Sequence, residues 1–450
     1  MSKVLFVSSR ENTNMDNDSY PRLGILLMGT LLKNLGHEVR IVHSISDKVD
    51  VFKFRDLLKE YQPNIVGFTL TTFQVKWTKV LTEEVKRWNK SCKVVIGGPH
   101  PSAVKEEIFK DFSFIDYSVI GEGEPLIKFL LEGNVKGGII DRKEVVEDLD
   151  SLPFPDLSLV DVFNFAGPYP IGKLPSIQIM GSRGCPQNCT FCFKYSYSRK
   201  VRYHSVNYVL ELIEYYKKLG IKEIGFLDDT LNLNQNWLRS LLEGIRRRGL
   251  NKGIIYRGAF RTDEKLVSLD LLKDMKRSGF WLLFYGVESG SQKILDNMNK
   301  QVRVEDTRRA FELTHRVGIK TVAPFMIGIP GETRDTIKES IEFSKKLKAF
   351  SVGFTRAQPL PGTVFRDQVV KAGYILNRDY SDYSFTQTNV RTDKLSFEEL
   401  EREFSKVSKL TLKSQFNQCL EDPSLLFRTF KAVGIREVIG RVKRNLVKVT

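Results

Sequence analysis

Short apolar segments alternate with longer helical segments along most of this chain, and no other feature restricts the fold as strongly. In the first third the expected strands are apolar throughout, as in strands covered on both faces, and helices join them. This series predicts an α/β fold with a doubly wound parallel sheet over residues 1–140, which binds ligands at the carboxyl ends of its strands. The expected strands are 3–9, 37–44, 64–72, 93–99 and 116–124, and the expected helices are 23–36, 51–62, 76–90 and 104–111.

A proline-rich segment separates this series from a second one. Residues 148–176 contain five prolines and no sustained periodicity, which places a linker at 141–173. The second series predicts a partial (β/α)6 barrel over 174–380, whose reacting groups collect at the carboxyl ends of the strands. A mostly helical region is expected over 381–450. The expected barrel strands are 176–182, 223–229, 254–261, 281–289, 321–329 and 351–360.

Composition restricts the class of protein. The chain has 450 residues, enough for a sizeable core and two or three domains. Its net charge of +16 comes from 70 basic residues interleaved with 54 acidic ones, which is typical of solvated helix faces rather than a nucleic-acid partner. We find no secretory signal, and the apolar run 280–287 is too short to span a bilayer. Five cysteines, three of them close together, indicate a reducing compartment, so we expect a cytoplasmic protein.

Three cysteines, Cys185, Cys189 and Cys192, fall within eight residues in the loop after the first barrel strand. A redox pair would use two thiols and leave the third unexplained. Zinc prefers four ligands, and the nearest further candidate is His204. An iron–sulfur cubane takes one thiolate per iron, so three cysteines would leave one iron open to a substrate or cofactor. The spacing favours the cluster and leaves the other two interpretations open.

Glycines and polar residues follow several strands of the first sheet. Because ligands bind at this edge, five of these residues are candidate ligand contacts, although tight turns require glycine whatever is bound. The segment after the first strand lacks the G-x-G-x-x-G spacing, so an ordinary NAD domain is not expected. The candidates are Thr71, Gly97, Gly98, Gly121 and Glu122.

The segment SRGCPQNCTFC, residues 182–192, resembles the cluster-binding motif of the radical S-adenosylmethionine (SAM) enzymes, which also use a partial six-stranded barrel. The resemblance implies that the three cysteines are metal ligands of a [4Fe–4S] cluster and that the open iron chelates SAM. It also implies cleavage of SAM to a 5′-deoxyadenosyl radical, with electrons from an external donor of flavodoxin or ferredoxin type. The chemistry belongs to the cofactor, and the protein positions it.

Segments at other strand ends resemble the parts of this family that face SAM, namely FLDDT, FRTD, YGVESGSQ, FMIGIPGET and QPLPGT. Carboxylates suit the cationic amine and the ribose hydroxyls, and glycines let the backbone approach the adenine. The alternative for each carboxylate is a helix cap or a pair with Arg261. Arg261 itself could be a structural partner of Asp263 or Glu288, and Tyr285 is expected in the core. No catalytic residue is assigned. The candidate SAM contacts are Asp228, Asp229, Arg261, Glu288, Ser289 and Gly328.

The first domain resembles the flavodoxin-like cobalamin-binding domain that precedes the barrel in many radical SAM enzymes. The segments that carry this resemblance are SYPRLGILLMGTLLKNLGHEVRIV, PNIVGFTLTT, VVIGGPHPSA and DYSVIGEGEPLIKFLL. Members that ligate cobalt through histidine carry it after the first strand, where residues 9–20 contain none, and His100 is not expected to reach cobalt. The resemblance implies bound cobalamin without a histidine lower ligand, and the alternative is an empty, vestigial domain.

The two modules together imply a cobalamin-dependent methyltransferase that acts on an unactivated carbon or phosphorus of a lipid, tetrapyrrole or secondary metabolite. A cobalamin-independent enzyme that forms or rearranges C–C bonds on a lipid-like substrate is the alternative, and a non-catalytic iron–sulfur sensor is a third hypothesis. A methylthiotransferase is disfavoured, because the first domain has only Cys92 where that group carries three cysteines.

The end of the chain resembles nothing that we can name. Ser396 and Glu399 predict a capping box at the start of a helix, and Cys419 is expected to be an incidental thiol. Residues 424–450 predict a basic amphipathic helix, which either docks on the protein itself or associates peripherally with the anionic inner face of the membrane. We expect this tail to cover the open end of the barrel and to help select the substrate.

Overall fold

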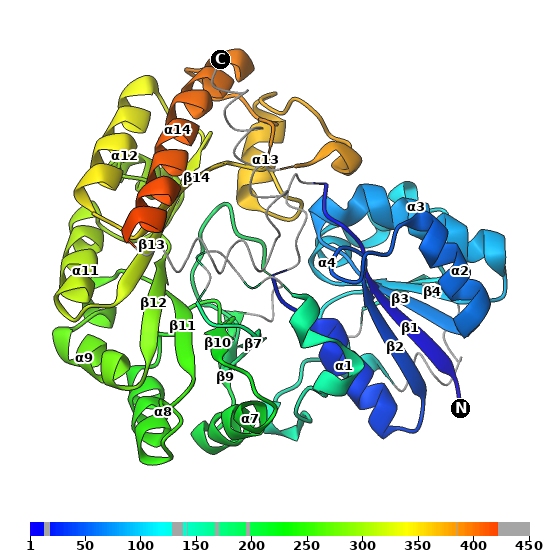
Figure 1. The fold of residues 1–450 in the computed structure, drawn as a ribbon. Helices are drawn as coiled ribbons and strands as arrows, with labels where there is room; N and C mark the ends of the chain where they lie inside the picture. The colour runs from blue at the N-terminus through cyan, green and yellow to red at the C-terminus, as the bar shows by residue number, and fades with distance from the viewer. Residues whose placement is uncertain are drawn as a thin grey trace.

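The computed structural model describes residues 1–12, 19–127, 138–141, 143–165, 167, 170, 172–194, 199–384 and 386–421. Two six-stranded sheets dominate the fold, the first at the right of Figure 1 and the second at the left. Every strand in both sheets pairs in parallel with its neighbours. The α/β fold class expected from the alternating segments is confirmed, while the exact domain limits remain predictions.

The first sheet has the order β2-β1-β3-β4-β5-β6. The second strand lies on one side of β1 and the later strands lie on the other, so the strand order reverses at β1. Such a reversal opens a crevice at the carboxyl ends of the strands. The sixth strand, β6, was not expected, since it is only three residues long. The strands are β1 (Lys3–Ser8), β2 (Glu38–His43), β3 (Ile65–Thr69), β4 (Lys93–Gly97), β5 (Tyr117–Val119) and β6 (Gly138–Ile140), and the helices are α1 (Leu23–Asn34), α2 (Val51–Tyr61), α3 (Val75–Trp88), α4 (Pro99–Val104) and α5 (Ile108–Asp111).

The second sheet follows chain order from one edge to the other, as in a partial barrel. An antiparallel pair, β8 (Ser182–Arg183) and β9 (Arg202–Tyr203), flanks the cysteine loop. The barrel strands are β7 (Ser176–Ile179), β10 (Glu223–Phe226), β11 (Ile255–Phe260), β12 (Phe280–Tyr285), β13 (Lys320–Ile327) and β14 (Ser351–Arg356). The helices are α7 (Val206–Lys218), α8 (Gln235–Arg247), α9 (Leu269–Arg277), α10 (Gln292–Asn297), α11 (Val304–Arg316), α12 (Arg334–Lys346) and α13 (Val364–Lys371).

Strand β13 of the barrel buries one face and leaves the other partly accessible. Along β13, buried side chains such as Ala323 and Phe325 alternate strictly with partly accessible ones. A strand places successive side chains on opposite faces, so one face of β13 meets the helices and the other faces the inside of the barrel. The helix-facing side chains share a hydrophobic core with Phe311 of α11 and Phe343 of α12. The core therefore lies between strands and helices, and the inner face of β13 remains partly accessible.

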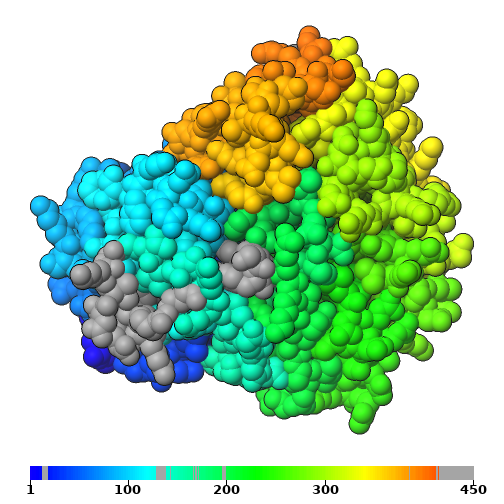
Figure 2. All heavy atoms as spheres, turned by 180° about the vertical axis from the view of Figure 1, so that it is seen from behind, coloured from blue at the N-terminus to red at the C-terminus, as the bar shows by residue number. Residues whose placement is uncertain are grey.

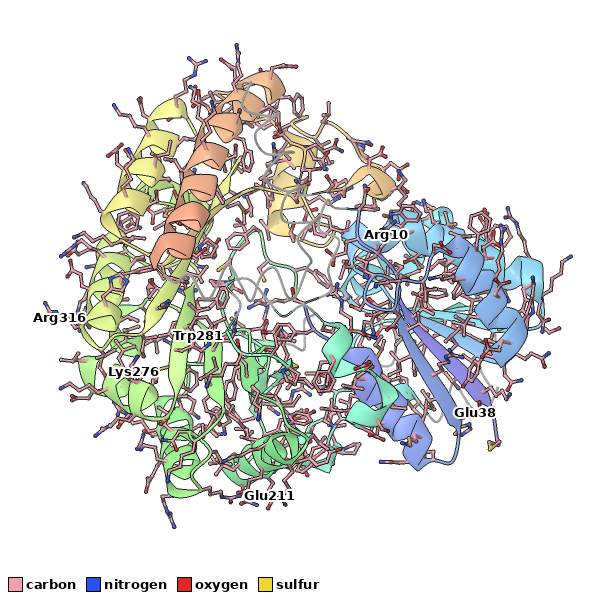
Figure 3. All side chains as sticks on the ribbon, viewed as in Figure 1. Arg10, Glu38, Glu211, Lys276, Trp281 and Arg316 are labelled. Atoms are coloured by element: carbon pink, nitrogen blue, oxygen red, sulfur yellow. The ribbon has the colours of Figure 1, made fainter. Side chains whose placement is uncertain are left out.

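Charged side chains of the outer helices point into solvent. Glu211, Lys276 and Arg316, labelled in Figure 3, are exposed on α7, α9 and α11. Positions like these, on the helix faces opposite the core, are where much of the basic and acidic surface of the chain is solvated.

The region after the barrel contacts both halves of the molecule. The long helix α14 (Phe397–Glu421) lies along β14, the edge strand of the barrel (Figure 1). The segment before α14 contacts the first domain, where the Tyr380 and His100 rings lie 4.9 Å apart between centroids. Figure 2 shows this segment in orange against both the cyan first domain and the green barrel.

The start of α14 has the predicted capping box. The N–H of Glu399 donates to Ser396 Oγ at 3.2 Å, and the N–H of Ser396 donates to Glu399 Oε2 at 2.9 Å. The basic helix predicted at 424–450 and the side chain of Cys419 lie outside the described residues. Within the described part of the chain, every helix is too short or too polar to cross a membrane.

Candidate active site

The three predicted cluster ligands lie on one loop that the chain braces from two sides. The first cysteine is buried, the second is partly buried, the third is accessible, and all are free thiols. Between the second and third, the N–H of Thr190 donates to the Met298 carbonyl at 2.8 Å. The Thr190 carbonyl in turn accepts from the N–H of Phe365 at 2.9 Å. These bonds fix the loop between the end of α10 and the start of α13.

The thiols lie within electrostatic reach of one another. Although Cys192 is accessible at its surface, protein surrounds it on most sides, and this desolvation raises the pKa of its thiol to about 11. Lys194 acts in the opposite direction, whereas Asp229 and the other two cysteines raise the pKa of Cys192 further. Metal ligation requires the thiolate, so binding at this loop releases protons.

The donor set fits a cluster better than a single ion. Among the described residues, no three Cys, His, Asp or Glu side chains are arranged to hold one metal ion. The fourth zinc candidate, His204, belongs to no such group among these residues, and its Nδ1 lies 3.0 Å from Asp150 Oδ1 in a hydrogen bond. A cubane places each thiolate on a different iron, so its ligands need not meet at one point. Three free thiols on one loop fit that requirement.

The two adjacent aspartates after β10 have different surroundings. Asp228 is buried, and it accepts hydrogen bonds from the Gly181 N–H at 3.0 Å and from Ser182 Oγ at 2.6 Å. Burial raises the pKa of Asp228 to about 6, although these hydrogen bonds act to lower it. Asp229 is exposed and lines a large cavity. Asp228 therefore holds the start of the cysteine loop, and the Asp229 carboxylate, which pairs with no described residue, faces the cavity.

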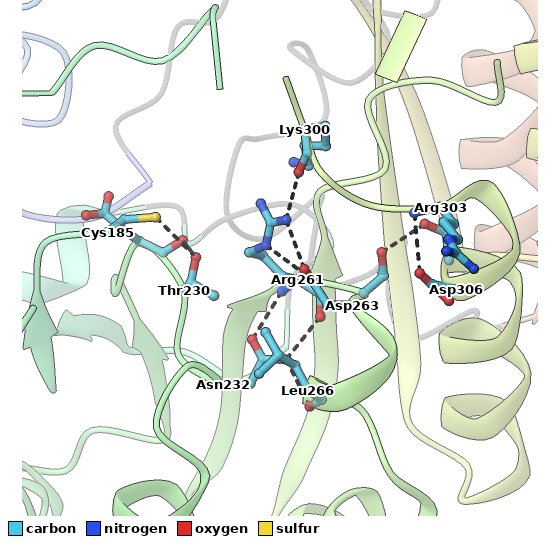
Figure 4. A network of polar contacts seen from close by, with 12 residues as sticks. Cys185, Thr230, Asn232, Arg261, Asp263, Leu266, Lys300, Arg303 and Asp306 are labelled. Carbon is cyan, nitrogen blue, oxygen red and sulfur yellow. Dashed lines mark hydrogen bonds and ion pairs between the residues drawn. The ribbon is translucent and has the colours of Figure 1, made fainter. Parts of the chain in front are cut away.

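Arg261 is occupied by contacts within the barrel (Figure 4). Its Nε and Nη2 donate to the Asp263 carboxylate at 2.8 and 3.1 Å, and Nη2 also donates to the Lys300 carbonyl at 2.7 Å. Its backbone is held by the Asn232 side chain at 3.2 and 3.0 Å. Arg261 is thus a structural partner of Asp263, and its role as a SAM contact stays a prediction.

Glu288 pairs with a lysine that no sequence motif singled out. Lys300 is buried, with its Nζ 3.0 Å from Glu288 Oε1 and 5.7 Å from the ring centre of Phe191 in the cysteine loop. The φ of Glu288 is 64°, in the left-handed region that residues other than glycine rarely adopt. The backbone of Glu288 nevertheless pairs with Phe325 of β13. A carboxylate and an ammonium group are therefore held beside the cysteine loop.

The last two predicted SAM contacts, Ser289 and Gly328, form hydrogen bonds with other residues of the barrel. Ser289 Oγ lies 3.1 Å from Ser340 Oγ in α12, in a hydrogen bond. Gly328 has a φ of 107°, and its N–H donates to Glu332 Oε2 at 2.5 Å. Glu332 is fully buried, which raises the pKa of its carboxyl to about 8. Tyr285 is fully buried, as expected for a core residue.

A cavity of about 490 Å³ connects the ligand edge of the first sheet with the cysteine loop. Ligands bind at the carboxyl ends of parallel strands in such folds, and here both sheets direct those ends to the same space. Apolar side chains of β1 and α1, including Phe6 and Met28, form much of the wall. Strand-end residues of the first sheet line it together with residues from the barrel side, which are Met180, Arg183, Gly184, Phe193, Lys194, Arg202 and Asp229.

Four of the five contacts predicted for the first sheet reach this cavity. At Gly98 a Cβ would lie 3.1 Å from neighbouring backbone atoms, and φ is 112°, so the turn itself requires glycine. Thr71 is not among the lining residues, and its N–H donates to Gln74 Oε1 at 2.9 Å. The four that line the cavity are Gly97, Gly98, Gly121 and Glu122.

Glu122 is engaged by arginines from the barrel side. Its Oε2 lies 3.1 Å from Arg202 Nη1 and 3.4 Å from Arg183 Nη1, and it accepts from the Val146 N–H at 2.8 Å. Burial acts to raise the pKa of Glu122, but hydrogen bonds from Arg202 and Val146 outweigh it and keep the pKa below its usual value. Neighbouring Glu124 pairs with Arg183 at 2.8 Å. These contacts join the first domain to the hairpin beside the cysteine loop.

The cavity suits a large, mainly apolar ligand. Its described lining contains no histidine. His100 faces elsewhere, with Nδ1 3.1 Å from Thr72 Oγ1 and its ring against Tyr380. Burial lowers the pKa of His100 to about 3, so it is neutral. The glycine-lined edge and apolar wall fit cobalamin, and His100 does not face the space where it would bind.

Two segments of the chain match known sequence families. Residues 179–344 match the radical SAM superfamily, and residues 16–130 match the B12 binding domain. An uncharacterized methyltransferase of Pyrococcus horikoshii is 28% identical, over 95% of this chain and 94% of its own. The hopanoid C-3 methylase of Methylococcus capsulatus is 27% identical, over 76% of this chain and 67% of its own.

Solved structures share the fold. The radical SAM methyltransferase TsrM of Kitasatospora setae superposes with a TM-score of 0.67 at 20% identity, over 90% of this chain and 83% of its own. The cobalamin-dependent SAM radical enzyme OxsB superposes with a TM-score of 0.62 at 21% identity, over 92% of this chain and 61% of its own.

The two family matches fall on the two sheets that share the cavity. They confirm, for the two domains, the cofactors expected from the sequence, which are a [4Fe–4S] cluster, SAM and cobalamin. The chain therefore combines a B12 binding domain with a domain of the radical SAM superfamily.

Proposed function

We propose that this enzyme transfers a methyl group to an unactivated carbon of a small molecule. The shared cavity carries the proposal, because it joins the glycine-lined edge of the first sheet to Asp229 and Lys194 beside the cysteine loop. A methyl donor and a radical generator that act on one substrate need sites that open into one space. Relatives named as methyltransferases or methylases of hopanoids, bacteriochlorophyllide d and cytidylyl-2-hydroxyethylphosphonate support methyl transfer to a lipid, tetrapyrrole or secondary metabolite.

Residues of this chain have distinct roles in the proposal. The three loop cysteines hold the cluster, as thiolate ligands do in such sites. The free carboxylate of Asp229 meets the cationic part of SAM or its ribose. The paired carboxylate and ammonium of Glu288 and Lys300 match the amino and carboxylate groups of the methionine part of SAM.

When bound, the cluster and SAM supply a radical that takes a hydrogen atom from the substrate, and cobalamin supplies the methyl group. The protein contributes a common space whose apolar wall excludes water. Reduction of the cluster uses an external one-electron donor of flavodoxin or ferredoxin type. The basic terminal helix remains a prediction. Binding to anionic liposomes tests it, by comparison of the full chain with a chain that ends at residue 423.

Product analysis tests the function. The anaerobic enzyme, loaded with iron, sulfide and cobalamin, is incubated with methyl-labelled SAM, a reductant and a panel of lipids and tetrapyrroles. We expect one 5′-deoxyadenosine and one S-adenosylhomocysteine for each labelled product. Deoxyadenosine without S-adenosylhomocysteine would instead indicate cobalamin-independent radical chemistry. No cleavage of SAM at all by the reduced, cluster-loaded enzyme would support the sensor hypothesis.

A further inference from the structure

The inner face of the barrel carries a continuous apolar band. Ala259 on β11 pairs in register with Phe284 on β12, which pairs with Val322 on β13. All three side chains are partly accessible, although their chain neighbours are buried. Because strand side chains alternate between faces, the three point to the same face, away from the helices. We call these residues, with Leu227, the apolar band.

Leu227 extends this band across the sheet toward β7, because Phe226 before it pairs with Gly258 on one side and with Ile179 on the other. It follows β10 and is 43% exposed, although it lies between two buried residues. Burial of a leucine side chain is favourable, so leaving one exposed inside the fold is costly unless a ligand covers it. Asp229, two residues further on, lines the cavity. A molecule on the band would therefore approach the cysteine loop.

The charged groups around the band are paired with one another. Each arginine or lysine on the described barrel strands has a carboxylate or an aromatic ring as its partner. Arg257, at the amino end of β11, pairs with Glu223 and lies 5.1 Å from the ring centre of Trp281, labelled in Figure 3. At the carboxyl ends the pairs are Arg261 with Asp263 and Glu288 with Lys300.

The mouth of the barrel disfavours an anion as well. Asp229 forms no ion pair with a described residue, so its negative charge faces the cavity. Lys194, the nearby cation, donates instead to the carbonyls of Cys185 and Gln187 at 3.1 and 3.4 Å. Gln178, on the inner face of β7, offers a neutral amide to a hydroxyl or carbonyl.

We infer that the substrate is an uncharged, largely apolar molecule that lies along the apolar band, with its reacting carbon toward Asp229. A buried anion would lose its hydration without gaining an unpaired arginine or lysine from the described barrel strands, which costs far more than burying an apolar skeleton gains. The inference rests on the proposed function, since it takes the inner face of the barrel as the place where methylation occurs.

Two matched ligands test this substrate class. N-phenyl-1-naphthylamine and 8-anilino-1-naphthalenesulfonate share one skeleton and differ by a sulfonate. Equilibrium dialysis is done on the enzyme loaded with cluster and cobalamin, so that the first-domain side of the cavity is filled. We expect the neutral ligand to bind about tenfold more tightly, a difference of about 1.4 kcal/mol.

Variants locate the binding site. Leu227→Asp should weaken binding of the neutral ligand about tenfold, with unchanged iron content and thermal midpoint. Val322→Asp is a second variant, used if Leu227→Asp lowers the iron content. Leu219→Asp, at a 47% exposed leucine that follows α7 on the outside, is the matched control and should leave binding unchanged.

The outcomes separate the inference from the function. Equal or tighter binding of the sulfonate, or binding that neither band variant affects, would overturn the substrate class while SAM cleavage still supports the enzyme. A second outcome is an enzyme that prefers the neutral ligand and loses this preference in the band variants, but fails to cleave SAM. That outcome would support an apolar site and refute methyl transfer.

Discussion

The carboxylate of Glu122, just after β5, accepts a hydrogen bond from the guanidinium of Arg202 in β9, with 3.1 Å between Oε2 and Nη1. The two residues are 80 positions apart, and they join the first domain to the hairpin beside the cysteine loop. Arg202 is 5% exposed, so water hardly screens the pair. The pair fixes one wall of the cavity in which cobalamin, the cluster and SAM are proposed to meet.

Removal of Arg202 should destabilise the protein. Arg202→Met leaves the half-buried Glu122 carboxylate short of a partner, and loss of one partner from a buried pair costs about 3 kcal/mol. Arg248→Met is the control, because its pair with Glu214 at 3.2 Å is more exposed and should contribute less than about 1 kcal/mol. Urea unfolding measures both, and equal losses for the two variants would contradict the account.

Loss of a loop cysteine should remove the cluster. Cys189→Ala deletes a thiolate that one iron requires, so we expect iron and sulfide contents to fall at least about tenfold after anaerobic reconstitution. Cys92→Ala, at a buried thiol in the core of the first domain, should keep the iron content of the unmodified chain. A full iron content in Cys189→Ala would refute the ligand assignment.

Glu332 should make stability depend on pH. Its folded-state pKa of about 8 lies above the usual 4.5, so the folded protein binds this proton more tightly than the unfolded chain. The stabilisation is complete below pH 4.5 and is lost as the pH rises toward 8. Urea unfolding between pH 5 and pH 8 should show a decline of about a few kcal/mol that Glu332→Gln makes smaller, most clearly above pH 6 where Asp228 no longer contributes. The control Glu305→Gln, at an exposed position, should retain the decline.

The adjacent aspartates should respond differently to amide substitution. Asp229→Asn removes a free charge beside the cysteine loop, so we expect the dissociation constant for SAM to rise about tenfold with unchanged stability. Asp228→Asn puts an amide donor where Gly181 and Ser182 already donate, which should lower stability by about 1–3 kcal/mol. Unchanged SAM affinity in Asp229→Asn, measured by equilibrium dialysis, would remove that residue from the cofactor site.

Sequence patterns predicted the strands but not the partners of their side chains. Periodicity is local, so strands such as β13 and β4 could be recognised from a few consecutive residues, whereas the three-residue β6 was too short to show one. The choice between Asp228 and Asp229 depends on which of two adjacent side chains faces the cavity, which the sequence does not state. The pairs Glu288–Lys300 and Glu122–Arg202 join residues 12 and 80 positions apart, and no motif connects them.

Metal content after anaerobic reconstitution tests most directly whether cobalamin occupies the shared cavity. A Cβ at Gly97 meets only ordinary contacts, 3.6 Å from Val119, so Gly97→Leu should fill the cavity without straining the backbone. Gly353→Leu, in open space on β14, is the matched control. The account predicts about four iron and one cobalt per chain for the unmodified enzyme and the control, and about four iron with almost no cobalt for Gly97→Leu. Cobalt retained by Gly97→Leu, or an unmodified enzyme with full iron and no cobalt, would contradict it.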